Sequence, residues 1–321
     1  MEPAAFADMP PGGILPVSSA SQRLIDPRVL SRLSNLELLA RTVVEGMMTG
    51  LHRSPHFGFS QEFAEYRAYN EGDDLRFVDW NVYARNDRMY IKRYRGDTNT
   101  TLTLLLDASA SMAFGGNSGD ADSGGISKFD YARYLCAALA YLASRQHDGA
   151  GLVVFDESVR DQLPASTRPD ALHRLLANLE SQQARSDTDI EGALDGLLMQ
   201  SRRRGLVVVV SDFYTEVEPF LAALQPLVFS GQDLAMFHVV DAQEVAPEFD
   251  SVVALRDLES GEQLDVDPDW LREGYRERFT AHCTSLSEAA RGCGADYMQV
   301  RTDEPLDAAL QRYLLFPQRK L

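Results

Sequence analysis

The sequence predicts an α/β fold with a doubly wound, mostly parallel sheet. From residue 101 onward, short and almost continuously apolar segments alternate with longer amphipathic ones. The apolar segments include LTLLLD at 102–107 and LVVVVSD at 206–212. Such strands are buried on both faces, as parallel strands are when crossover helices cover the sheet.

Each element of this alternation can be placed from its pattern. Strands are predicted where short apolar runs end at polar residues, at 102–107, 150–156, 206–212, 234–241 and 295–300. Helices are predicted where apolar residues recur at helical spacing, at 127–146, 170–181, 189–203, 217–227, 268–291 and 305–316. A β-hairpin is predicted at 252–266, before the long helix.

The chain is predicted to have three parts, which are a disordered tail at 1–28, a helical and β accessory segment at 29–98, and the α/β domain at 99–321. The accessory segment should begin with a helix at 29–50, because its leucines and Val43 form one apolar stripe and Gly50 can end it. Short strands are expected at 75–80 and 88–95.

The charge of the chain argues against nucleic acid as a partner. The 321 residues include 31 Lys and Arg against 48 Asp and Glu, which gives a formal net charge of -17. Nucleic acids are bound through clustered cations that neutralise phosphates. An acidic chain is therefore expected to bind other partners.

The sequence also predicts a cytoplasmic protein without a membrane span. Glu2 and Asp8 stand where a signal peptide needs positive charge. No window approaches the ~20 apolar residues of a membrane helix. Three cysteines without metal-type spacing favour a reducing compartment, and Cys136 is predicted to be a core residue.

Five oxygen-bearing side chains are predicted to meet at one edge of the sheet. Asp107 ends one predicted strand, and Ser109 and Ser111 follow it at alternate positions. Thr188 opens a predicted helix, and Asp212 ends another predicted strand. Open α/β sheets bind ligands outside the carboxyl ends of their strands, so these oxygens are expected to converge. An all-oxygen set is typical of a hard cation, and Mg²⁺ is the predicted ion.

Each of these residues also has an ordinary structural interpretation. Asp107 could be a cap, and the two serines could be turn residues. Thr188 could be a helix N-cap that forms a capping box with Glu191. Asp212 could begin a turn.

The five residues together resemble the metal-ion-dependent adhesion site of von Willebrand factor A domains, which has the pattern D-x-S-x-S, a distant Thr and a later Asp. The resemblance implies a von Willebrand factor A-like, Rossmann-type sheet. It also implies that Ser109 and Ser111 ligate Mg²⁺ directly, while Thr188, Asp107 and Asp212 act directly or through water. A vacant position on the ion would then accept a carboxylate from a client protein.

The segment at 53–95 carries a second resemblance. Its stretch EFAEYRAYNEGDDLRFVDWNVYAR is similar to the bacterial family called domain of unknown function 58. Members of that family are typically encoded beside MoxR-type AAA+ ATPases, which implies such an ATPase as a partner in a chaperone-like role. The charged residues of the segment could form a docking surface or an internal ion network.

These observations favour a non-enzymatic, Mg²⁺-dependent protein-interaction module that acts with a MoxR-type ATPase in the assembly or maturation of client proteins. One alternative is a metal-dependent phosphohydrolase with Asp107 as its nucleophile. Haloacid-dehalogenase-like enzymes need an acid two residues later, and Ser109 stands there. The other alternative is a scaffold whose metal site is vestigial.

Overall fold

The computed structural model describes part of the chain in detail, namely residues 35–51, 63–68, 82, 89–94, 101–115, 125–184, 204–245, 247, 253–256, 263–266 and 274–315. The predicted tail at 1–28 lies outside these residues. So do the predicted strand at 75–80 and the predicted helix at 189–203.

A six-stranded sheet with the order β10-β7-β6-β3-β4-β5 forms the centre of the fold. Its strands are β3 (Thr101–Asp107), β4 (Gly149–Phe155), β5 (Val159–Ser166), β6 (Gly205–Ser211), β7 (Asp233–Val240) and β10 (Asp296–Arg301). All neighbouring strands are parallel except β4 and β5, which are antiparallel. The order reverses at β3, because β4 lies on one side of it and β6 on the other. This sheet confirms the predicted fold class.

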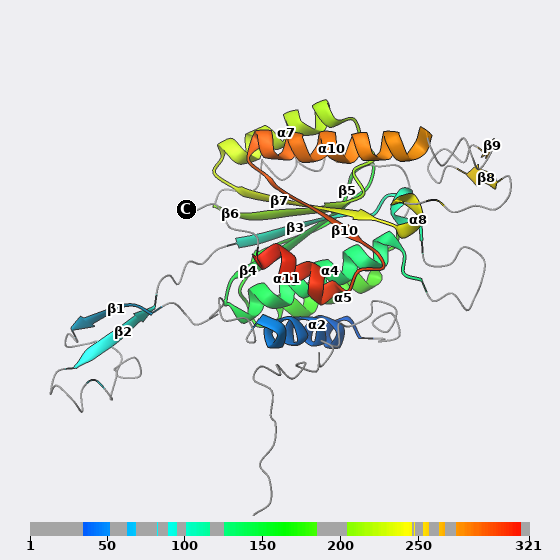
Figure 1. Ribbon diagram of the computed structural model, residues 1–321. Coiled ribbons are helices and arrows are strands. Elements are labelled where there is room, and N and C mark those ends of the chain that lie inside the picture. The colour runs from blue at the N-terminus through cyan, green and yellow to red at the C-terminus, as the bar shows by residue number, and fades with distance from the viewer. Residues whose placement is uncertain are drawn as a thin grey trace, which may run out of the picture.

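Helices cover both faces of the sheet (Figure 1). One face packs against α4 (Lys128–Arg145), α5 (Ala171–Ser181) and α11 (Leu306–Leu315), and α2 (Leu36–Leu51) packs on the outer side of these helices. The other face packs against α7 (Val217–Phe229) and α10 (Arg276–Cys293). The central strand β3 contributes side chains to the hydrophobic cores on both faces of the sheet. Leu104 and Leu106 belong to the first core cluster, and Leu105 belongs to the second. Continuous apolar strands are needed for this reason.

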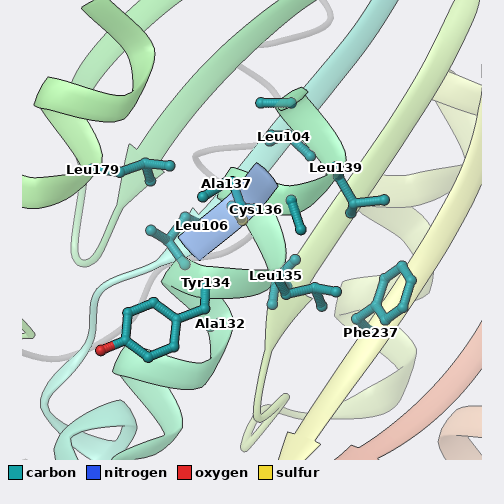
Figure 2. Close-up of a cluster of buried hydrophobic side chains, with 14 of the residues drawn as sticks. Leu104, Leu106, Ala132, Tyr134, Leu135, Cys136, Ala137, Leu139, Leu179 and Phe237 are labelled. Carbon is teal, nitrogen blue, oxygen red and sulfur yellow. The ribbon is translucent and has the colours of Figure 1, made fainter. Parts of the chain in front are cut away.

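The larger core cluster lies between β3 and the alanine-rich helix α4 (Figure 2). Leu104 and Leu106 from the strand lie beside Leu135 and Cys136 from the helix, and Phe237 of β7 borders them. The Cys136 side chain is fully buried, which confirms its predicted core position. The small alanines of α4 let the helix pack closely on the sheet.

Helix α2, from the predicted accessory segment, packs into this same core. Leu39, Val43 and Met47 are fully buried in the larger cluster. Two polar contacts fix the ends of the helix: the Leu36 N–H donates to Oε1 of Glu180 at 2.9 Å, and Nε2 of Gln311 donates to the Met47 carbonyl at 3.2 Å. Residues 36–51 therefore share one hydrophobic core with the α/β domain.

Most other elements lie where their patterns predict. The predicted hairpin is present as β8 (Val253–Arg256) and β9 (Gln263–Val266), which pair antiparallel. The predicted helix at 268–291 is observed as α10 (Arg276–Cys293), and residues 268–273 lie outside the described residues. A 3-10 turn, η2 (Ala110–Ala113), follows β3, and a short helix, α8 (Ala242–Val245), follows β7.

Two strands were not predicted. β1 (Phe63–Ala68) pairs antiparallel with β2 (Tyr90–Tyr94), which lies within the predicted strand at 88–95. β5 lies at the edge of the main sheet, where a half-exposed strand can contain Pro164 without losing an internal ladder bond. No helix among the described residues has the length and apolar character that crossing a membrane needs.

Candidate functional site

The candidate site lies at the carboxyl ends of β3 and β6, two neighbouring parallel strands. Asp107 is the last residue of β3, Ser211 is the last residue of β6, and Asp212 follows directly. Because the strand order reverses at β3, this edge contains the topological switch point at which open α/β sheets bind their ligands.

Asp107 is buried, with 1% of its surface exposed, and both of its carboxylate oxygens accept hydrogen bonds. The Ser109 N–H donates to Oδ1 at 2.9 Å, and the Ser211 hydroxyl donates to Oδ2 at 2.6 Å. Burial raises the pKa of Asp107 to about 7, the negative charge of Asp212 adds to the rise, and the hydrogen bonds oppose it. Asp107 thus orients the loop that follows β3 and retains a proton more readily than an exposed aspartate.

Ser109 and Ser111 present two hydroxyl oxygens side by side on that loop. Ser109 caps η2 in an extended conformation, and its hydroxyl is hydrogen-bonded to the Ser111 hydroxyl, with the two Oγ atoms 3.0 Å apart. Mg²⁺ binds oxygen ligands at about 2.0–2.1 Å in octahedral geometry, so two adjacent ligands lie about 2.9 Å apart. The two hydroxyls are already at that spacing. The donor set therefore fits a small hard cation.

The buried side chain of Lys128 lies at the same edge of the sheet and contacts Asp212. Nζ of Lys128 lies 2.7 Å from Oδ2 of Asp212 and 2.6 Å from Oε1 of Glu244. The three side chains are 1%, 1% and 9% exposed, respectively. The Lys128 ammonium also lies 4.7 Å from the centroid of the Tyr214 ring, a cation–π distance.

The chain path explains why Lys128 reaches this edge. Lys128 is the first residue of α4, whose N-cap is Ser127. The Lys128 N–H donates to the Phe114 carbonyl at 2.9 Å, and Gly115 forms a β-bridge with Ser127. These bonds fasten the end of the loop after β3 to the start of α4, which places the lysine beside the loop that carries the serines.

The two carboxylates keep Lys128 charged. Burial alone would lower the pKa of the Lys128 ammonium, but the attraction of Asp212 and Glu244 outweighs it and raises the pKa. In Glu244, burial raises the pKa of the carboxyl and Lys128 opposes the rise. With all three groups ionised, the cluster of Lys128, Asp212 and Glu244 carries one net negative charge.

The predicted ligands can now be compared with the structure. Asp107, Ser109, Ser111 and Asp212 lie at the one edge of the sheet where they were expected. Thr188 lies outside the described residues, and its part in the site stays a prediction. Across the described ranges, no group of three or more His, Cys, Asp or Glu side chains has the arrangement of a metal site.

Sequence reasoning missed three polar residues of this edge: Ser211, Lys128 and Glu244. Ser211 obeys the same rule as the predicted ligands, because it is the last residue of β6, and Glu244 lies in α8, the short helix that follows β7. The position of Lys128 in the sequence also indicated an acidic partner. A cation in the first turn of a helix is opposed by the helix dipole, so a lysine there indicates a nearby anionic partner.

The chain is similar to known proteins in sequence and, more weakly, to solved structures in fold. The chain is 29% identical over 310 residues to the uncharacterized protein Rv1480 of Mycobacterium tuberculosis (strain ATCC 25618 / H37Rv), covering 95% of this chain and 94% of that protein. A solved structure of an aerotolerance-related membrane protein from Bacteroides fragilis NCTC 9343, with multiple mutations to serines, matches with a TM-score of 0.45 and 19% identity, over 67% of this chain and 96% of that chain. BatB from Bacteroides thetaiotaomicron matches with a TM-score of 0.43 and 18% identity, over 67% of this chain and 97% of that chain.

The family comparison covers most of the α/β domain and part of the segment before it. The model described as "Protein of unknown function DUF58" matches residues 65–285. That range includes the loop after β3, the start of α4 and the ends of β6 and β7. The chain therefore belongs to the DUF58 family.

Proposed function

We propose that this chain is a non-enzymatic protein-interaction module that holds Mg²⁺ at the carboxyl edge of its sheet and binds a carboxylate of a client protein there. The observation that carries the proposal is the separation of 3.0 Å between the Ser109 and Ser111 hydroxyl oxygens, on a loop oriented by buried Asp107. Two neutral ligands at octahedral spacing suit an ion that keeps further positions for other oxygens.

Each residue of the site has a separate task in this proposal. Ser109 and Ser111 would bind the ion, and Asp107 and Asp212 would supply the negative charge that draws it in. Thr188 is the remaining proposed ligand. Bound Mg²⁺ would supply an open coordination position for an oxygen from another protein. Among the proposed ligands that the structure describes, Asp107, Ser109 and Asp212 are buried, and Ser111 is partly exposed.

A MoxR-type AAA+ ATPase is the proposed partner, and chaperone-like assembly or maturation of a client is the proposed process. Family membership and the similarity of the segment at 53–95 to that family support this part of the proposal. Most of this segment lies outside the described residues, so the proposal names no docking residues for the ATPase.

The geometry of Asp107 favours binding over phosphoester hydrolysis. An aspartyl nucleophile needs an oxygen that can reach the phosphorus atom of the substrate. Both oxygens of Asp107 accept hydrogen bonds from inside the protein, and the side chain is buried.

The test is Mn²⁺ binding to the full chain, followed by electron paramagnetic resonance and competed with Mg²⁺. Saturable binding by the native chain, lost in the Ser109→Ala/Ser111→Ala double variant, is the expected result. A matched control is Ser181→Ala/Ser230→Ala, because both of these hydroxyls donate to backbone carbonyls at the ends of helices. Equal binding by both double variants would contradict the proposed ligands.

Client binding needs a second experiment. The immobilised chain is mixed with cell lysate, once with Mg²⁺ and once with chelator, and the captured proteins are compared. Capture that requires both Mg²⁺ and the two serines supports the proposal. Turnover of a generic phosphoester that Asp107→Ala abolishes would instead establish the phosphohydrolase alternative.

A further inference from the structure

We infer that Lys128 is a built-in cation of the metal site, which competes with the divalent ion for Asp212 and so sets how tightly the site binds metal. This inference rests on the proposed function, because it concerns regulation of the same site. It adds a residue that the D-x-S-x-S pattern does not contain.

The first support is that the Lys128 ammonium already contacts Asp212, one of the proposed metal ligands. Oδ2 of Asp212 is 2.7 Å from Nζ of Lys128, at the distance of a strong charge-assisted hydrogen bond. Among the described residues, the partner of Oδ1 of Asp212 is the Tyr214 N–H, which donates a long bond of 3.4 Å. The ammonium thus holds the better-placed oxygen of this carboxylate, and a metal that uses the negative charge of Asp212 must share it with Lys128.

The second support is the complete burial of the lysine. The Lys128 side chain is 1% exposed, and it is among the largest fully buried side chains of the described residues. Water screens its charge weakly at such a position, so its repulsion acts strongly on a second cation nearby. The two cationic positions share Asp212 as a partner, because this aspartate contacts the Lys128 ammonium and is also a proposed ligand of the metal.

The third support is that stability alone is a poor reason for this arrangement. A buried ion pair contributes little net stability compared with apolar side chains of similar volume, because two charges lose their hydration. A lysine in the first turn of α4 is further opposed by the helix dipole. Its two acidic partners come from different strand ends, after β6 and β7, which places the charge at the predicted ligand edge.

Glu244 has a defined part in this balance. Its Oε1 accepts from Lys128 at 2.6 Å, and its Oε2 accepts from the Asp241 N–H at 2.7 Å. Glu244 is therefore a second carboxylate partner of the lysine and offsets part of its charge. When the Asp212 carboxylate binds a metal, Glu244 remains as the ion-pair partner of the Lys128 ammonium.

Three variants of the full chain test the inference, with Mn²⁺ as the probe and Mg²⁺ as the competitor. Lys128→Met keeps the volume and removes the charge, and the affinity for Mn²⁺ should rise by about tenfold or more. Glu244→Gln leaves the lysine with Asp212 alone, and the affinity should fall by a similar factor. Lys128→Met/Glu244→Gln removes one charge of each sign and should bind at least as tightly as the native chain.

Circular dichroism in chelator shows whether each variant is folded. If Lys128→Met does not fold, because it leaves two buried carboxylates unpaired, the double variant and Glu244→Gln decide the question. The inference is overturned if folded Lys128→Met or folded Glu244→Gln binds Mn²⁺ with the affinity of the native chain, and the proposed metal site then still stands. If the native chain and all variants bind no Mn²⁺, the inference and the proposed function both fail. If only the chains without Lys128 bind it, the inference is supported and the proposed Mg²⁺ dependence of the native chain is wrong.

Discussion

The Ser211 hydroxyl at the end of β6 donates a hydrogen bond of 2.6 Å to Oδ2 of Asp107 at the end of β3. The Ser211 oxygen also accepts from the Phe213 N–H at 2.9 Å. One buried serine thus joins the two strand ends that carry the proposed site, and it supports both the Asp107 carboxylate and the turn after β6.

The Ser211→Ala variant is expected to lose both stability and metal affinity. The change leaves the Phe213 N–H and Oδ2 of Asp107 without this partner, which costs about 1–3 kcal/mol of unfolding free energy. The hydrogen bond also lowers the pKa of Asp107, so its loss raises that pKa further and weakens cation binding near neutral pH. Urea unfolding in chelator and Mn²⁺ titration at pH 7 measure the two effects. Unchanged affinity for Mn²⁺ would show that Asp107 does not contribute to binding of the ion.

The stability of the metal-free chain should depend on pH through Asp107. Its folded pKa of about 7 lies above the ordinary value of 3.8, so the folded chain retains a proton that the unfolded chain releases. This group's contribution to stability is full below pH 3.8 and is lost as the pH rises toward 7. Unfolding free energies in chelator at several pH values between 4 and 8 measure the slope, and Asp107→Asn should remove that part of it.

Added Mg²⁺ should reverse the loss above pH 7. The ionised form of Asp107 is the one that attracts a cation, and a ligand that binds only the folded chain stabilises it. The rise in melting temperature with Mg²⁺ should therefore grow between pH 6 and pH 8. The same rise at every pH would contradict a role for Asp107 in the proposed site.

Helix α2 is expected to be part of the domain's folding unit. Leu39 is fully buried in the larger core cluster, so Leu39→Ala should cost about 2–5 kcal/mol of unfolding free energy. Leu38 is its neighbour on the same helix and is 50% exposed, which makes Leu38→Ala a matched control with a small effect. Equal effects of the two changes on urea unfolding would show that α2 does not depend on this core.

The central strands of the fold were predictable from sequence because they are buried on both faces. β3, β6 and β7 are continuous apolar runs, and no other arrangement buries them as well. β5 has no such run, because it lies at an edge and its side chains are mostly half-exposed. Its place depends on a contact distant in sequence: a Cβ on Gly151 of β4 would lie 2.6 Å from the Ala165 backbone nitrogen, so glycine lets the two strands approach.

The candidate site was predictable where its residues are fixed by strand ends. Asp107 and Asp212 follow apolar strands, so the topology alone places them at one edge. Lys128 was not predicted as a partner of Asp212, because its sequence position gives no distance to a strand 84 residues away. A lysine is usually an exposed residue, and only its first-turn position in α4 indicated acidic neighbours.

The most direct measurement of the central claim is an anomalous difference map from crystals of the chain grown with Mn²⁺. The account predicts one ion at about 2.0–2.2 Å from both Oγ of Ser109 and Oγ of Ser111. Asp107 and Asp212 should lie around it, directly or through water. No anomalous peak beside these hydroxyls, with the Lys128 ammonium as the only cation at this edge, would contradict the account.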